Sequence, residues 1–378
     1  MMTNLSIGII GGGIVGSTAA YYLARQGYKV TLFDEDTGQA TKAAAGIICP
    51  WFTLRRNKPW YFLVSNGAEF YHQLIKDLNE DGYATNHLYQ TVGTIIPRKN
   101  QPSLERDVQR AKERLQQSPA IIGVETLARE EVGEHFPLLQ SDYGATLVKG
   151  GARVDGKALI DTLNKAFQQL KGTYINKRVH LSRTLDQVTV HTSQNSYSFD
   201  RLLLASGAWL PNLLNPLGFE VMIRPQKGQL YSAFNKEWIG NQWPVVMAPG
   251  KFDIIPNENG EIVIGATHED DRECNLDIEM ERINQLVTFA EEWLPGFSQY
   301  AIHQIKVGIR AYTPDSGVLV GQVPALSNVW AVSGLGSSGL TSGPFIGYQW
   351  SQLIHTGQWM LSKDDFPIER YIQLNATK

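Results

Sequence analysis

The fold of this chain is decided by residues 5–34, LSIGIIGGGIVGSTAAYYLARQGYKVTLFD. Ser6–Ile10 is a short apolar run with β-branched residues, which is typical of a buried parallel strand. Gly11, Gly13 and Gly16 follow it with G-x-G-x-x-G spacing. In this motif the first glycine permits a tight turn, the second lets the backbone approach a pyrophosphate, and the third lets the next helix pack closely. The stretch therefore predicts a strand, a turn and a helix that bind a dinucleotide.

The residues after these glycines complete the unit. Val15, Ala19 and Leu23 repeat every four residues and predict a helix, whose N-terminus offers free N–H groups and a positive dipole to a phosphate. Residues 29–33 predict the second strand, and Asp34 at its end stands where a carboxylate binds a ribose hydroxyl. A glycine-rich turn without a ligand is the alternative. The position between two strands, with an acid at the right distance, favours the dinucleotide site.

Length and composition restrict the class of protein. A chain of 378 residues predicts two domains, and 43% hydrophobic and 19% charged residues are ordinary for a globular protein. The net charge of −3 predicts neither a nucleic acid nor an anionic membrane as partner. The two cysteines suggest no disulfide framework and no metal site. We find no transmembrane run and no signal peptide, so we expect a cytoplasmic protein, with a homo-oligomer left open.

Later segments indicate how the chain is divided. Residues 201–205 and 328–332 predict strands that run into small residues, as at the ligand-binding carboxyl edge of a parallel sheet. Antiparallel strands are predicted between them, with a hairpin turn at Asn259-Gly260. Earlier in the chain, residues 88–96 predict a strand and residues 125–134 a short helix.

The predicted fold class is therefore α/β with two domains. We expect a discontinuous Rossmann-like nucleotide-binding domain and a second, mainly antiparallel α+β substrate domain. The nucleotide-binding domain would comprise residues 1–82, 144–216 and 304–378, and the substrate domain residues 83–143 and 217–303.

The order of these segments resembles the D-amino acid oxidase family of FAD-dependent amine oxidoreductases, to which glycine oxidase, sarcosine oxidase and D-amino acid dehydrogenase belong. The resemblance runs to about residue 356. The later motifs that carry it are TKAAAGIICP, GGARVDGKAL, LLLASGAW, RPQKGQL, DIIPNENGEIVIGATHED, GIRAYTPDSGVLVG and SGLGSSGLTSGP. Each of them alone is loose, but together with the opening motif they follow one another in the family's order.

The resemblance implies an extended, bound FAD. The implied cofactor-binding residues are Gly11, Gly13, Ile14, Val15 and Gly16 at the pyrophosphate; Asp34 at the ribose, with Glu35 beside it; Thr41, Lys42, Ala43, Ala45 and Gly46 beside the isoalloxazine ring; Val179 near the adenine; Ala205, Gly207 and Trp209 along the pyrophosphate and ribityl chain; and Gly336, Ser337, Ser338, Gly339, Leu340 and Thr341 at the pyrimidine end. A helix that begins near Gly339 would point its positive end at the flavin atoms that collect negative charge on reduction.

The resemblance also implies two catalytic residues. Arg310 matches the arginine that binds the substrate carboxylate, for which a guanidinium fork is suited; the alternative is a structural arginine paired with an acid at a domain interface. Asp253 matches a tyrosine that lies over the flavin in glycine oxidase-like members. It could pair with a substrate amine or a second cationic group, or be a loop carboxylate facing water. His268, Tyr61 and Trp60 could line the pocket or serve ordinary packing.

Two departures from the family pattern bear on the chemistry. Ala311-Tyr312-Thr313 lacks the cysteine that carries covalent flavin in some members, so we expect non-covalent FAD. Val263 matches the lysine that activates oxygen in the sarcosine oxidase branch. The electron acceptor is therefore either oxygen or an unidentified carrier.

The implied activity is oxidation of the C–N bond of a small amino or imino acid, of the D-amino acid, glycine or sarcosine type, by hydride transfer to flavin N5. A flavoprotein dehydrogenase acting on a 2-hydroxy acid, or on an amine without a carboxylate, is the alternative. A third possibility is a flavin-binding subunit or RNA-modifying module that needs a partner, against which the absence of any basic stretch argues.

Overall fold

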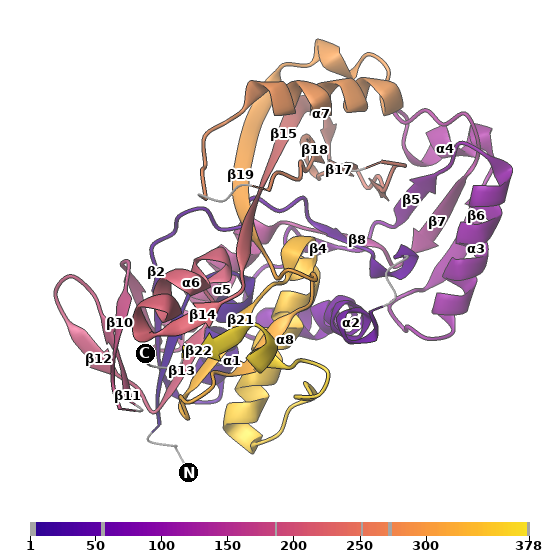
Figure 1. Ribbon diagram of the computed structural model, residues 1–378. Helices are drawn as coiled ribbons and strands as arrows, with labels where there is room; N and C mark the ends of the chain where they lie inside the picture. Colours follow the sequence, from indigo (N-terminus) through magenta and orange to yellow (C-terminus); the bar gives the residue numbers. More distant parts are fainter. Residues whose placement is uncertain (1–4, 54–56, 186, 251, 271–273, 376–378) are drawn as a thin grey trace.

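The structure is a computed structural model that describes residues 5–53, 57–185, 187–250, 252–270 and 274–375 (Figure 1). The α-helices of these residues are α1 (Ile14–Arg25), α2 (Lys58–Glu80), α3 (Gln101–Leu115), α4 (Arg129–His135), α5 (Gly156–Gln169), α6 (Leu210–Leu214), α7 (Met280–Trp293) and α8 (Gly339–Thr356). Short 3₁₀ turns occur at Pro50–Phe52, Gly207–Trp209, Asn215–Leu217, Phe297–Gln299, Gly336–Ser338 and Ile368–Arg370.

A six-stranded sheet forms the lower half of the molecule in Figure 1. Its strands, in spatial order, are β20 (Leu319–Gln322), β21 (Val329–Ser333), β13 (Arg201–Leu204), β1 (Ser6–Ile10), β2 (Lys29–Asp34) and β9 (Thr173–Asn176). All neighbouring pairs are parallel except β20 with β21. Strands from three remote parts of the chain therefore end at one edge of this sheet.

Both faces of this sheet are covered, which explains why its strands are continuous apolar runs. Ile7, Ile9 and Leu203 pack on one face in the same core as residues of α1, α5 and α8. Ile10 and Leu204 point to the opposite face, where they join α6 and a small sheet of β10 (His180–Thr184), β11 (Gln187–His191) and β12 (Ser196–Ser198).

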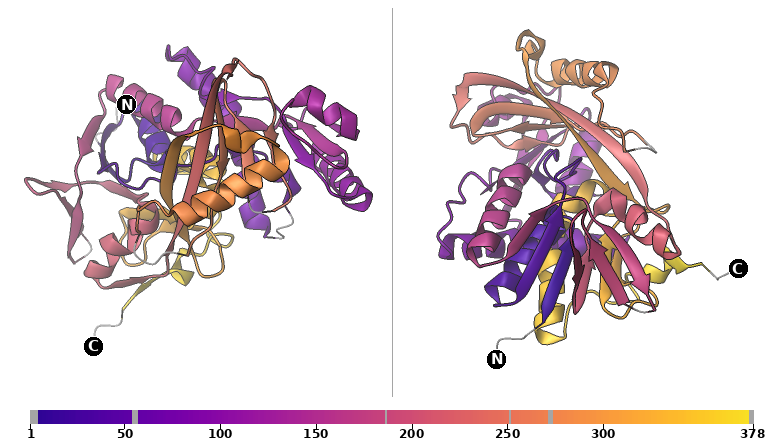
Figure 2. Two further views of the ribbon diagram at one scale, coloured as in Figure 1. Left: turned by 90° about the horizontal axis from the view of Figure 1, so that it is seen from above. Right: turned by 90° about the vertical axis from the view of Figure 1, so that its left-hand side faces the viewer.

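An eight-stranded sheet forms the upper half. Its strands, in spatial order, are β19 (Ile302–Tyr312), β15 (Arg224–Ile239), β18 (Asn259–Gly265), β17 (Asp253–Pro256), β16 (Val245–Val246), β5 (Thr94–Pro97), β7 (Ala145–Lys149) and β6 (Gly123–Leu127). Only β16 and β5 pair in parallel. The apolar stripe of α7, with Ile283 and Leu286, covers the outer face. The long strands β15 and β19 descend from this sheet to the lower half (Figures 1 and 2).

Two small sheets complete the strands. The first joins β14 (Phe219–Val221) to β22 (Ile372–Leu374), and the second joins β3 (Ile47–Ile48), β8 (Ala152–Val154) and β4 (Tyr89–Gln90). The second sheet links the segment after β2 to the strands that lead into α5.

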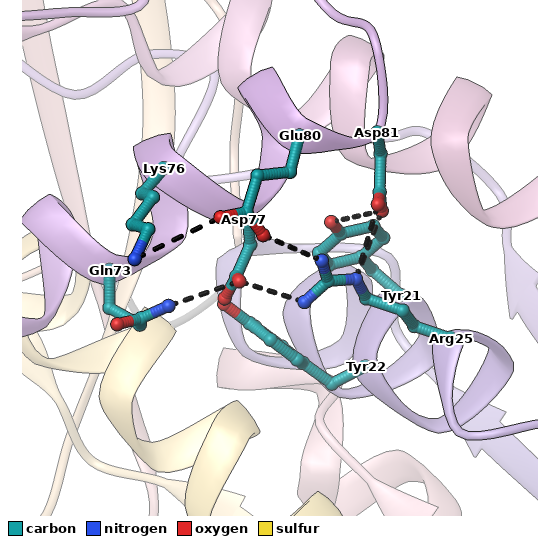
Figure 3. A network of polar contacts seen from close by, with 8 residues as sticks. All are labelled: Tyr21, Tyr22, Arg25, Gln73, Lys76, Asp77, Glu80 and Asp81. Carbon is teal, nitrogen blue, oxygen red and sulfur yellow. Dashed lines mark hydrogen bonds and ion pairs between the residues drawn. The ribbon is translucent and has the colours of Figure 1, made fainter.

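A polar network joins α1 to α2 (Figure 3). Asp77 of α2 accepts hydrogen bonds from the Tyr22 hydroxyl at 2.6 Å and from Arg25 Nη1 at 2.7 Å. The Tyr21 hydroxyl donates to Asp81 at 2.6 Å. Asp77 is buried, so its charge needs these partners. The network anchors the helix that follows the glycine turn to its neighbour, away from the turn itself.

The expected α/β class, with a Rossmann-like sheet and a second antiparallel sheet, is confirmed. The pairing of two strands differs from the expected division, because β7 pairs with β5 and β6, and β19 pairs along β15. Residues 145–149 and 302–312 thus belong to the upper sheet, whereas the expected nucleotide-binding domain includes 144–216 and 304–378. The division into domains remains a prediction.

Two local predictions were wrong. The strand expected at residues 88–96 is two short strands, β4 and β5, in different sheets. The helix expected at residues 125–134 is β6 followed by α4, because pairing with β7 extends the first half of this segment. Tertiary pairing outweighed local helix preference here.

Candidate active site

The carboxyl ends of β1, β13 and β21 meet at a cavity of about 360 Å³. These strands are parallel neighbours, so the turns that follow them lie at the same edge of the sheet. The cavity is lined by Gly11, Gly13, Ile14, Val15, Asp34, Glu35, Thr41, Val179, Ala205, Gly207, Trp209, Arg310, Gly336 and Gly339 among the predicted residues. The structure thus brings together three glycine-bearing turns, of which the first and the last are more than three hundred positions apart in the sequence.

The glycine positions show why a side chain is absent at each. A Cβ on Gly11, whose φ is +105°, would collide with the Ala205 carbonyl, and a Cβ on Gly16 with the Gly11 carbonyl. These two glycines permit close backbone packing. A Cβ on Gly13 would instead point into space and meet only the Thr41 hydroxyl, at 3.7 Å. Gly13 therefore leaves room for a ligand at the N-terminus of α1, as a pyrophosphate requires.

Two polar atoms on the cavity wall are buried and have no hydrogen-bond partner among the described residues. They are Ser206 Oγ and Gln39 Oε1. Native proteins rarely leave buried polar groups unpaired, so both atoms fit a polar ligand in the cavity. Asp34 accepts from the Gly12 and Asp36 amides and from Gln39 Nε2 at 2.8 Å. These contacts hold its carboxylate at the cavity edge.

Basic side chains that the sequence did not reveal as site residues line the end of the cavity near Glu35. Lys177, Arg178 and His180 line it around the predicted Val179. Arg178 pairs with Glu35, with Nε and Oε2 2.8 Å apart. The run KRVH directly follows β9, a strand of the parallel sheet, and that position was the available signal.

The N-terminus of α8 forms another part of the cavity wall. Gly336 and Gly339 line the cavity, and no side chain caps the first turn of α8. The Ser337 amide donates to the Tyr312 hydroxyl at 3.1 Å. Ser338 Oγ accepts from Trp60 Nε1 at 3.0 Å, which joins α2 to this turn. The free end of α8 is thus available to a partly negative group.

Other predicted cofactor residues lie outside the cavity lining: Gly16, Lys42, Ala43, Ala45, Gly46, Ser337, Ser338, Leu340 and Thr341. Lys42 pairs with Asp36, and the Leu340 carbonyl accepts from the Tyr71 hydroxyl at 2.6 Å. Ala45 packs against the apolar group around Leu230. Contacts of these residues with the cofactor remain predictions.

Arg310 projects from β19 into the cavity. Its Nη1 donates to the Thr267 carbonyl at 2.8 Å and to Gln226 Oε1 at 3.2 Å. The guanidinium lies over Gly228, where a Cβ would be 2.8 Å from the guanidinium carbon. Burial lowers the pKa of Arg310, which still remains charged at neutral pH. No carboxylate of the described residues forms an ion pair with it, so the expected alternative of an interface ion pair finds no support.

Asp253 begins β17, opposite Gly265 of β18. Its carboxyl has no hydrogen bond or ion pair within the described part of the chain, and burial raises its pKa to about 7. It also lies near the buried Cys49, whose pKa burial raises to about 12, with a smaller contribution from Asp253. The alternative of a loop carboxylate facing water is wrong, because the residue is part of a strand and partly buried. Asp253 does not line the cavity.

The remaining pocket candidates lie elsewhere. Tyr61 packs under the Arg114 guanidinium, 4.1 Å from the ring centroid, and Trp60 contacts Ser338. His268 is exposed, and Val263 is buried in an apolar group. None of these residues lines the cavity.

Neither a membrane span nor a metal cluster is found in the described ranges. Their helices include none with the length and hydropathy of a bilayer-spanning helix. Those ranges also hold no group of three or more His, Cys, Asp or Glu residues placed to bind a metal ion.

The glycine-lined cavity and its partly buried arginine are typical of a dinucleotide-dependent enzyme, and comparison with known proteins identifies the class as FAD-dependent oxidoreductases. The model of the FAD dependent oxidoreductase (DAO) family matches residues 6–353. The chain therefore belongs to this family, which confirms the resemblance to the D-amino acid oxidase family, the enzymatic nature of the protein and its use of FAD.

Individual relatives agree with this assignment. The chain is 36% identical to the oxidoreductase YurR of Bacillus subtilis, over 92% of this chain and 94% of the relative. It is 25% identical to glycine oxidase of Bacillus licheniformis, over 92% of both chains. The structure of iminodiacetate oxidase from Chelativorans sp. BNC1 superposes with a TM-score of 0.90 at 29% identity, covering 97% of this chain and 98% of that one.

Proposed function

We propose that this enzyme oxidises the C–N bond of a small amino or imino acid. The observation that carries the proposal is the partly buried Arg310, which lines the cavity without an ion-pair partner among the described residues. Two relatives act, by their names, on glycine and on iminodiacetate, which both combine an amine with a carboxylate. A substrate carboxylate would give the guanidinium the charged partner that it lacks.

Arg310 has donors to spare for this role. Only Nη1 is hydrogen-bonded to described acceptors, so Nε and Nη2 can take a carboxylate bidentately. Holding the carboxylate orients the adjacent carbon, and such positioning supplies much of the rate when no strong base is needed. When bound, the flavin supplies the hydride acceptor at N5. The lone pair of the neutral amine would then form the C=N bond as the C–H hydrogen is given up as hydride, and water would hydrolyse the imine product.

Asp253 is the second proposed site residue. The register pairs Asp253 with Gly265, Gly265 with Leu230, and Gln226 with Arg310, so both charged side chains belong to the same face of the sheet. A carboxyl without a described partner on this face could pair with the substrate amine or with a second cationic group. Its raised pKa lets it take up a proton near neutral pH.

The binding mode of FAD and the electron acceptor complete the proposal. The residues after Arg310 are Ala311, Tyr312 and Thr313, which offer no thiol for a flavin bond, so we propose that FAD is held non-covalently. The Val263 side chain is surrounded by Leu230, Val245 and Ile255, so it places no cation in the site. Oxygen and a separate electron carrier are the two candidate acceptors.

Anaerobic titration of the purified, FAD-loaded enzyme tests the proposal. Glycine, sarcosine, D-alanine, proline and iminodiacetate would be compared with lactate and with methylamine, by loss of flavin absorbance. We expect an amino or imino acid to reduce the flavin and the last two to fail. If only lactate or methylamine reduced the flavin, the proposal would be wrong, and the substrate would be a 2-hydroxy acid or an amine without a carboxylate. Acid precipitation should leave the flavin in the supernatant, and re-oxidation with oxygen or a dye would separate the two acceptors.

A further inference from the structure

The strand ladder behind Arg310 contains an irregular pair. Residues that face each other in a hydrogen-bonded antiparallel pair normally exchange two bonds between amides and carbonyls. Thr267 and Gln229 exchange only one such bond, from the Thr267 amide to the Gln229 carbonyl at 2.9 Å. The Gln229 amide donates instead to the Thr267 hydroxyl at 2.8 Å. The Thr267 carbonyl is thereby released from the ladder, and it accepts Arg310 Nη1 at 2.8 Å.

The Thr267 hydroxyl is itself fixed by Glu269. A hydroxyl has one hydrogen, and here the oxygen accepts from Gln229 while the hydrogen points to Glu269 Oε1. Gln229 Nε2 also donates to Glu269 Oε1, at 2.9 Å. Thr267 and Gln229 are both buried, so water does not compete for these bonds. The carboxylate therefore determines which way the hydroxyl points.

A buried lysine holds Glu269 in turn. Lys227 is fully buried, and its Nζ lies 3.9 Å from Glu269 Oε2 and 2.7 Å from Glu279 Oε1. Two backbone bonds, of 2.7 and 2.9 Å, also join Lys227 to Glu269. Because burial removes the ammonium from water, these carboxylate and backbone contacts are what fix the position of the Lys227 side chain. This side chain therefore connects the network to the start of α7.

We propose that Thr267, Glu269 and Lys227 are positioning residues that hold the Arg310 guanidinium in the orientation that binds the substrate carboxylate. The inference rests on the proposed function and assigns part of its carboxylate affinity to groups that never touch substrate. The competing view is that the network only stabilises the sheet. The two views differ for one substitution, Thr267→Val, which keeps the shape of the side chain and removes the hydroxyl.

The experiment measures acetate binding to the FAD-loaded enzyme by calorimetry, together with KM and kcat for the best amino acid substrate. Thr267→Val should weaken acetate binding and raise KM about tenfold, with kcat changed less than threefold. Thr267→Ser keeps the hydroxyl and should stay within about twofold of the parent enzyme. Thr146→Val is the matched control, because Thr146 is a buried threonine of the same sheet whose hydroxyl has no described partner.

Each outcome decides between the views. Equal acetate affinity of Thr267→Val and Thr146→Val would overturn the inference, as would equal losses for Thr267→Val and Thr267→Ser. Should Thr267→Val not fold, Glu269→Gln keeps the size of its side chain and should shift acetate binding in the same direction. Arg310→Ala separates the two levels of the argument. If Arg310→Ala binds acetate normally, the proposed clamp fails; if it loses acetate while Thr267→Val does not, only the positioning role fails.

Discussion

The two large sheets contribute to the site in different ways. The six-stranded sheet contributes turns at the ends of β1, β13 and β21, where glycines and backbone amides face the cavity. The eight-stranded sheet contributes a side chain from within β19, Arg310, whose direction depends on pairing with β15. Under the proposed function, the six-stranded sheet would bind the cofactor through backbone groups and glycines that leave room for it, and the eight-stranded sheet would bind the substrate through the charge of Arg310. Substitutions in the first sheet should therefore reduce FAD binding, and substitutions in the second should reduce substrate binding.

The largest effect is expected at the glycine turn. Gly13→Ala adds a Cβ that meets only the Thr41 hydroxyl, so the chain should fold, but the methyl group would occupy the space that we assign to the cofactor pyrophosphate. We expect FAD affinity to fall about a hundredfold. FAD content after gel filtration, and the thermal midpoint of the apoprotein, measure the two consequences.

Gly133→Ala in α4 is the control for this substitution, because a Cβ there meets nothing within 4 Å. It should keep full FAD content and gain a little stability from helix propensity. Full flavin content in Gly13→Ala would show that this turn does not approach the cofactor, and the comparison between the sheets would lose its first half.

The second largest effect is expected from substitutions of Arg310, the charged residue that the eight-stranded sheet contributes to the cavity. Arg310→Ala should retain FAD and lower kcat/KM for amino acids about a thousandfold, because a buried charge-assisted pair is lost. Arg310→Lys keeps the charge without the fork and should recover only part of the activity. Steady-state kinetics with an amino acid and with an amine lacking a carboxylate provide the measurement, with the exposed Arg106→Ala as a control. A uniform fall for both substrates would argue against carboxylate binding.

Substitutions in the polar network that joins α1 to α2, which lies away from the cavity, should change only the stability of the protein. Asp77→Ala leaves the Tyr22 hydroxyl and Arg25 without their buried acceptor (Figure 3). We expect a loss of about 2–4 kcal/mol in the free energy of unfolding. Glu80→Ala removes a more exposed partner of Arg25 and should cost below about 1 kcal/mol. Urea unfolding distinguishes the two variants, and amino acid specificity should be the same in both. Similar losses of unfolding free energy in the two variants would mean that the burial of Asp77 does not determine how much the network stabilises the protein.

The smallest expected effect is the change in the pH dependence of stability when Asp253 is replaced. Its pKa of about 7 in the folded chain exceeds the ordinary value near 4, so the folded state binds the proton more tightly. This contribution to stability therefore falls as pH rises from about 4 to 7 and is constant above. Asp253→Asn removes the dependence and should be more stable than the parent at pH 8, on the order of 1 kcal/mol, and similar at pH 4.

Asp200 is a control of opposite sign for this prediction. Hydrogen bonds from the Ser6 amide and hydroxyl lower the pKa of Asp200, so its contribution is present above the ordinary value and is lost as pH falls. Asp200→Asn should therefore be less stable than the parent at pH 7 and equal to it in strong acid. Thermal melts across pH test both variants. Parallel pH profiles for the two would refute the assigned burial of Asp253.

Local pattern predicted the parts of the fold in which neighbours in sequence are neighbours in space. The predicted β1, α1 and β2 are confirmed, and the predicted ends of the two strands agree with the structure to within one residue. The apolar period and the glycine spacing that predict them lie within a stretch of about thirty residues. The pattern failed at β6, where a helix was expected, because the extended conformation of this segment depends on pairing with β7. The sequence did not indicate Lys177 and Arg178 as site residues, because they line the cavity only as a result of the pairing of β9 with β2.

By itself, the sequence determined that a dinucleotide turn opens the chain, that parallel strands recur near residues 201 and 329, and that the chain resembles one family. These properties follow from spacing, hydrophobicity and glycine geometry, which act locally. Only the tertiary structure decided that Arg310 points into the cavity, that the Thr267 carbonyl is released to hold it, and that Asp253 is desolvated on the same sheet face. Register, burial and hydrogen-bond partners arise from contacts between remote segments, and no local pattern specifies them.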